Sequence, residues 1–308
     1  MNFKLVTQLS PPAGLDAALT RVVGFDASPV ADELAVLFVQ GGAPGTKRGV
    51  LARFQMGNEP KLVQLVEDKQ LNVAKAVLFL ADGSAMLVAA SAVYRVALTD
   101  GAVLQSLIPQ KAEALVRVAD GRVVLLHWGS LALRSPDAAS VLLEAKVKSN
   151  DMISLLSVAP DARLAATGGA ENYVRLFELE KGEMLKRIPV AGAGAQTSSF
   201  SLDGTLFAHG PTSAGQIVVR KTTGKFDVVR ELKASRQLRS LAFGTDGRLA
   251  AVFSPILPPG PGSLSLWSQD GSQLASTGLG VDANQVRWWG ERLLVNGGSG
   301  LQVFEVGA

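Results

Sequence analysis

The stretch 153–190 shows a hydrophobic pattern that recurs along most of the chain. Its apolar residues fall into four short runs, separated by turn residues at Pro160-Asp161, Gly168-Gly169 and Lys181-Gly182. The apolar positions alternate or cluster over a few residues, and no stripe with a 3.6-residue period continues from one turn to the next. Runs of this length between such turns predict an antiparallel sheet of four strands. One such sheet cannot bury both of its faces, so copies of it are expected to stack.

The first hairpin turn of this unit recurs at a nearly constant spacing. Asp-Gly or a close equivalent stands at positions 82, 120, 161, 203 and 246, which are 38, 41, 42 and 43 residues apart. Further turns at Asp32-Glu33 and Gly290-Glu291 extend the series to seven. A period of about 40 to 45 residues with four strands per repeat is typical of propeller blades. The six Asp-Gly dipeptides are interpreted as turns that need a positive φ and a local side-chain hydrogen bond.

The sequence therefore predicts an all-β fold, a seven-bladed β-propeller of four-stranded antiparallel blades in a single domain over 1–308. The seventh blade has only three predicted strands, whereas residues 3–9 form a strand without a blade. We expect this N-terminal strand to complete the last blade, because closure removes unpaired edges. The predicted blades span about 19–66, 74–108, 112–147, 153–190, 195–233, 237–277, and 284–306 with 3–9.

Composition and charge narrow the class of protein. The 30 basic and 27 acidic residues leave a net charge of +3, and no more than two basic residues follow one another, so nucleic acid is not an expected partner. No segment approaches the ~20 apolar residues of a membrane span, and no secretory signal is visible. The absence of cysteine excludes disulfides and thiolate metal sites and is compatible with a reducing compartment. We expect a cytoplasmic protein.

Blade four carries a resemblance to the WD40-repeat family. Its Pro160-Asp161 turn, its strand at 164–169 (LAATGG) and its strand at 174–178 (VRLFE) resemble that family's Pro-Asp turn, "latGg" strand and "VrlWd" strand. In blade six, Leu266-Trp267 matches the tryptophan position. Phe177-Glu178 stands where the family has Trp-Asp, and no Gly-His dipeptide precedes a blade. The resemblance implies a propeller that acts as a protein-interaction scaffold.

The loop at 41–49 (GGAPGTKRG) is similar in place and glycine content to the loop of Sec12-like propellers. This resemblance implies a guanine-nucleotide exchange factor for a small GTPase, with a potassium ion in the loop. Ala43-Pro44 interrupts the glycines here, and the asparagine usual near that loop is absent. The exchange factor is therefore the alternative function.

The sequence offers few candidates for catalysis or metal binding. His127 and His209 are the only histidines, and each is predicted to end the second strand of its blade, without nearby carboxylates in the sequence. No Gly-x-Ser-x-Gly elbow occurs, and the order Thr46-Lys47 does not match a phosphate-binding loop. We therefore expect no enzyme, no cofactor and no metal. An enzyme or small-ligand binder that uses the central funnel is the second alternative.

The remaining candidates are surface residues for binding a protein partner of unknown identity, with a small GTPase as the alternative. Arginine and aromatic residues are common at interface hot spots, and a proline-rich loop loses little entropy on binding. The first expectation is therefore a non-catalytic scaffold in a multiprotein assembly. The candidate contact residues are Lys47, Arg48, Lys69, Trp128, Pro258 and Pro259.

Overall fold

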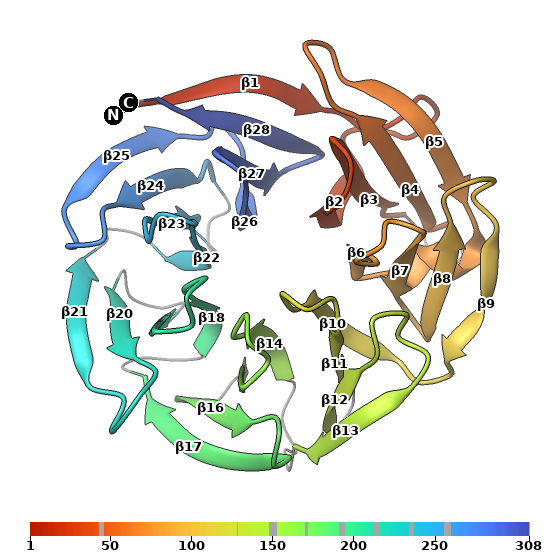
Figure 1. The fold of residues 1–308 in the computed structure, drawn as a ribbon. Helices are drawn as coiled ribbons and strands as arrows, with labels where there is room; N and C mark the ends of the chain where they lie inside the picture. Colours follow the sequence, from red (N-terminus) through yellow and green to blue (C-terminus); the bar gives the residue numbers. More distant parts are fainter. Residues whose placement is uncertain are drawn as a thin grey trace. The chain divides into compact units, whose positions relative to one another are not determined.

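A computed structural model describes residues 1–42, 46–127, 129–147, 153–169, 172–190, 195–211, 216–233, 237–255 and 260–307. The described residues form 28 strands and one short 3-10 helix. The strands make seven four-stranded antiparallel sheets, each from consecutive strands except the last, which also contains β1. The fold is a seven-bladed β-propeller (Figure 1), as the repeat period predicts. The sheets belong to two compact units.

One unit, residues 9–148 with 298–301, contains blades one to three. Blade one is β2 (Thr20–Ala27), β3 (Glu33–Gln40), β4 (Arg48–Gln55) and β5 (Lys61–Glu67); the helix η1 (Lys69–Val73) follows it. Blade two is β6 (Ala76–Phe79), β7 (Ala85–Ala89), β8 (Val93–Ala97) and β9 (Val103–Ile108). Blade three is β10 (Ala112–Arg117), β11 (Val123–His127), β12 (Ser130–Arg134) and β13 (Val141–Lys146).

The other unit, residues 1–8, 149–297 and 302–308, contains blades four to six and most of blade seven. Blade four is β14 (Ile153–Val158), β15 (Leu164–Gly169), β16 (Tyr173–Glu178) and β17 (Glu183–Pro189). Blade five is β18 (Ala195–Phe200), β19 (Leu206–Pro211), β20 (Gln216–Lys221) and β21 (Val228–Lys233). Blade six is β22 (Leu238–Phe243), β23 (Leu249–Phe253), β24 (Ser263–Trp267) and β25 (Gln273–Gly278). Blade seven is β26 (Ala283–Trp289), β27 (Arg292–Gly297), β28 (Gly300–Val306) and β1 (Phe3–Leu9).

The N-terminal strand completes the last blade, as predicted. β1 lies along β28, the outer of the three C-terminal strands (Figure 1). The N–H of Gly307 donates to the Asn2 carbonyl at 3.0 Å. The rings of Phe3 and Phe304 meet edge to face with centroids 6.3 Å apart. This pairing covers the edge that β28 would otherwise expose.

The Asp-Gly turns adopt the conformation that their chemistry predicts. The glycine has a positive φ in all six dipeptides, and the aspartate accepts a hydrogen bond from the backbone N–H two residues later. The inner turn of blade four keeps this geometry without glycine: Ala162 has φ 58°, and Asp161 Oδ1 accepts the Arg163 N–H at 2.9 Å. Turn chemistry is local, and it is therefore readable from the sequence.

The cores lie between neighbouring blades. In blades two and three, Leu87 and Ala89 of β7 pack in one cluster with Leu125 of β11 and Ala132 of β12. Similar clusters join blades one and two, four and five, five and six, and six and seven. In these five pairs the facing sides of neighbouring sheets are buried against each other, which is why the repeats require one another.

The helix η1 was not predicted. Asp68 caps it by accepting the Gln70 N–H at 2.8 Å, and Leu71 is fully buried. Its Asn72 side chain accepts the Gly49 N–H at 2.8 Å, so η1 lies against the first residues of β4. A side chain at Gly49 would overlap the Leu71 carbonyl, so this approach requires glycine. Five residues are too few for a helical period to show in the sequence.

Candidate functional site

The structure brings three of the predicted contact residues to one end of blade one. Lys47 and Lys69 are exposed, the first just before β4 and the second at the start of η1. The contact between Gly49 and Asn72 joins their two segments. Lys47 and Lys69 form no ion pair with any other described residue.

Arg48 is engaged within the fold. Its guanidinium donates to both Glu67 oxygens, at 2.8 and 2.7 Å, and to the Gly14 carbonyl at 2.8 Å. The residue therefore ties β4 to β5 and to the segment before β2. Trp128, Pro258 and Pro259, the other predicted contact residues, lie outside the described residues.

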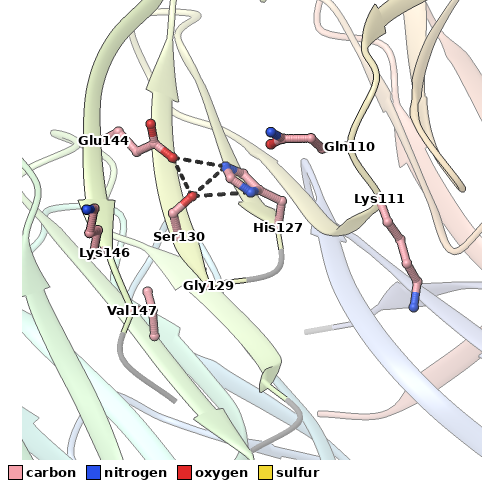
Figure 2. A pocket seen from close by; sticks show the side chains of 8 residues that line it. All are labelled: Gln110, Lys111, His127, Gly129, Ser130, Glu144, Lys146 and Val147. Atoms are coloured by element: carbon pink, nitrogen blue, oxygen red, sulfur yellow. Dashed lines mark hydrogen bonds and ion pairs between the residues drawn. The ribbon is translucent and has the colours of Figure 1, made fainter. Parts of the chain in front are cut away.

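A pocket opens beside blade three, at the end where β11 ends and β12 begins. Its volume is about 580 Å³. The connection from blade two to blade three contributes to one side of it, and the ends of β11, β12 and β13 contribute the rest (Figure 2). Its lining residues are mostly polar: Gln110, Lys111, His127, Gly129, Ser130, Glu144, Lys146 and Val147.

Three of these side chains form a closed hydrogen-bonded network (Figure 2). Ser130 Oγ lies 2.5 Å from His127 Nε2 and donates to Glu144 Oε1 at 2.6 Å. Glu144 Oε1 also lies 3.5 Å from His127 Nε2. The tight turn at Gly129, with φ 82°, pairs Ser130 with His127. The pairing of Ala132 with Glu144 sets this carboxylate on the same face of the sheet.

The network differs from a serine-hydrolase triad. In that triad the nucleophile contacts one ring nitrogen of the histidine, and the acid contacts the other. Here Glu144 and Ser130 both approach Nε2, and the hydroxyl donates directly to the carboxylate. This arrangement orders the three side chains and places a carboxylate beside an imidazole at the pocket wall.

Basic residues flank the network. Lys111 Nζ lies 3.0 Å from Glu113 Oε1, and Lys75 pairs with the other oxygen of the same carboxylate. The hydrogen bond and charge of Glu113 raise the pKa of Lys111. Burial raises the pKa of Glu113, but the hydrogen bonds and charges of Lys75 and Lys111 outweigh burial, so the pKa of Glu113 lies below its usual value. Lys146 is exposed and has no ion pair among the described residues.

The sequence-based expectation for the two histidines holds only in part. His127 does end the second strand of blade three, but the fold supplies the carboxylate, Glu144, that sequence proximity did not show. His209 lies two residues before the end of β19 and is 1% exposed. It accepts a hydrogen bond from Arg220 Nε at 3.1 Å and stacks on Phe207. Burial and the Arg220 charge lower its pKa to about 3.

No sequence motif marks the pocket residues as a group. Ser130 and Glu144 are common residue types 14 positions apart, and only strand register places them together. One available signal was the short hairpin over 127–130, where glycine follows the end of a predicted strand.

Neither a scan of protein-family models nor a search of curated proteins matched this chain. Within the described ranges, no group of three or more acidic, histidine or cysteine side chains is placed to hold a metal ion. In the same ranges, no helix has the length and apolar character needed to span a membrane.

Proposed function

We propose that this propeller is a non-catalytic scaffold that binds an acidic surface of a protein partner through one end of blade one. The observation that supports the proposal most directly is the pair of exposed lysines, Lys47 and Lys69, left without ion pairs among the described residues where η1 meets β4. Strands and a capped helix hold the backbone next to both lysines. A partner would therefore meet a largely preformed surface, as in most rigid complexes.

The WD40-like character is part of this proposal. The residues that resemble the family in blade four, 164–169 and 174–178, occupy β15 and β16, the second and third strands of the blade. Propellers with this repeat present loops and strand ends from a rigid frame, which suits a scaffold. Exposed lysines contribute mainly to the rate of association and to the choice of partner, and less to affinity.

The test is a crosslinked affinity purification from the native cell followed by binding measurements with purified components. The informative variant is Lys47→Glu with Lys69→Glu. Arg48 is left intact, because its reversal would break the Glu67 ion pair. The matched control is Lys61→Glu with Lys233→Glu, which makes the same charge change at two exposed lysines elsewhere.

We expect the intact protein and the control variant to bind the same partner. The Lys47/Lys69 variant should bind that partner about tenfold less tightly, and the affinity of the intact protein should fall as the salt concentration is raised. Equal binding by all three proteins would contradict the proposal.

The Sec12-like alternative involves a loop in which residues 43–45 lie outside the described ranges. Recovery of a small GTPase, with faster nucleotide release in the presence of the protein, would favour that alternative.

A further inference from the structure

We propose that the pocket beside blade three is a subsite for a carboxylate side chain of an extended acidic peptide, with Lys146 as the main charge partner. This inference rests on the proposed function, because the peptide would belong to the same kind of acidic partner. The pocket and the first-blade lysines lie in one compact unit, at the end of the sheets where second strands stop and third strands start.

The hydrogen-bonding groups of the pocket divide into engaged and available ones. His127, Ser130 and Glu144 Oε1 satisfy one another. Glu144 Oε2, the Lys146 ammonium and the Gln110 carboxamide have no hydrogen-bond partner among the described residues. The side chain of Glu144 is 51% exposed, so its second oxygen is open to solvent. The available set is thus one cation, one carboxamide and one carboxylate oxygen.

This set is complementary to a peptide with an acidic side chain. A carboxamide both donates and accepts, so Gln110 can pair with a peptide N–H and C=O. The free Glu144 oxygen accepts from a further peptide N–H, and Lys146 neutralises the ligand carboxylate. A free inorganic anion could accept from Lys146 and from the Gln110 amide, but it has no donor for the free Glu144 oxygen, which would repel it. The carboxylate in the wall therefore favours a ligand with backbone donors.

The size and layout of the pocket also suit a chain segment. Its volume of about 580 Å³ lies within the range of small-ligand pockets and exceeds the size of one acidic side chain. Lys146 and Lys111 stand on opposite sides of the His127 network (Figure 2). Lys111 is half exposed although it pairs with Glu113, so it can meet a second acidic group of the same segment.

Blade five supplies a matched control position. β13 (VLLEAK) and β21 (VVRELK) align, so that Lys233 corresponds to Lys146 and Glu231 to Glu144. Opposite Lys233 stands Gln216, where blade three has Ser130, and the Gln216 side chain donates to Glu231 at 2.9 Å. Lys233→Glu therefore repeats the change of Lys146→Glu at the same strand end but outside the pocket.

The experiment measures fluorescence anisotropy of a labelled, amidated hexaglutamate peptide with the intact protein, and hexaglutamine serves as the uncharged comparison. We expect hexaglutamate to bind and hexaglutamine not to bind. Lys146→Glu should weaken binding about tenfold, since it exchanges an attraction for a repulsion, whereas Lys233→Glu should leave it unchanged. Lys146→Arg should retain binding. Zero-length carbodiimide coupling should join the peptide to Lys146.

Any of three results would overturn the subsite. If the intact protein does not bind hexaglutamate, or if Lys146→Glu and Lys233→Glu bind it equally, the pocket does not hold acidic peptides. Loss of binding in Lys47→Glu with Lys69→Glu, but not in Lys146→Glu, would overturn the subsite and leave the proposed scaffold function in place. Circular dichroism of each variant separates loss of binding from loss of fold.

Discussion

The guanidinium of Arg117 lies 3.3 Å from the carboxylate of Asp26, measured from Nη1 to Oδ2, although 91 residues separate them in the chain. Arg117 ends β10 in blade three, and Asp26 is near the end of β2 in blade one. Between them, Phe79 of β6 donates its N–H to Asp26 at 2.9 Å and accepts from Arg117 at 2.5 Å. The pair therefore links the first strands of three successive blades.

Removal of the cation from this pair should destabilise the protein. In Arg117→Met, Asp26, which is 8% exposed, would keep its charge without the paired guanidinium, so we expect a loss of about 3 kcal/mol in the free energy of unfolding. Urea unfolding followed by circular dichroism measures it. Arg122→Met is the control, because its partner Asp120 is exposed and local, and it should cost less than about 1 kcal/mol. Equal losses in the two variants would refute a special role for the Asp26 pair.

Glycine in place of Ala162 should stabilise the inner turn of blade four. Ala162 holds a left-handed φ of 58°, which costs an L-residue about 1 to 2 kcal/mol, whereas glycine pays mainly a smaller entropic cost. We expect Ala162→Gly to raise the free energy of unfolding by about 0.5 kcal/mol.

The reverse change at the corresponding turn of blade two should destabilise it. Gly83 has φ 67°, and an added Cβ would overlap a methyl group of Val30. Gly83→Ala should therefore cost more than about 1 kcal/mol. Thermal melts of both variants beside the parent protein measure the two effects. Shifts of the melting temperature in the same direction for both variants would show that turn conformation does not control stability at these two positions.

The buried histidine of blade five should make stability depend on pH. Burial lowers the pKa of His209 to about 3, below its unfolded value near 6.5. Between these values the unfolded chain binds a proton that the folded chain does not, so this contribution to stability is complete above about pH 6.5 and is lost as the pH falls. The expected slope within the window is about 1.4 kcal/mol per pH unit.

The variant His209→Gln isolates this contribution. Its amide oxygen can accept from Arg220, but it cannot titrate. Carboxylates such as Asp203, whose pKa is lowered by hydrogen bonds from Ser201 and Thr205, titrate in both proteins and cancel in the comparison. Urea unfolding at several pH values from 5 to 7 should show a steeper pH dependence in the parent protein. Identical slopes would mean that His209 does not titrate as proposed.

Blade boundaries were predictable because they depend on local chemistry. In blade four, each of the four strands begins and ends within one residue of one of the four apolar runs in the stretch 153–190. The pairing of the N-terminal run at 3–9 was also predictable, because the last blade has only three strands of its own and would otherwise leave an open edge. The helix η1 was missed, since its five residues hold one buried side chain, Leu71, and no period.

The candidate site was predictable only in part. The sequence predicts Lys47 and Lys69 as surface contact residues, and the structure places both near the contact between β4 and η1. It predicts the same for Arg48, but the ion pair of Arg48 with Glu67 could not be read from the sequence. The pocket beside blade three was not predicted, because its residues belong to four strands or connections and no motif joins them.

The sequence by itself determined the number of blades, their order and the strand that completes the last one, because hairpin turns and alternating apolar runs act over a few residues. Only the tertiary structure decided which polar side chains meet. The contacts of Glu144 with His127 and of Arg117 with Asp26 depend on strand register and on the stacking of one blade against the next. Those relationships span 17 and 91 residues, and many sequences with the same turns and apolar pattern would lack them.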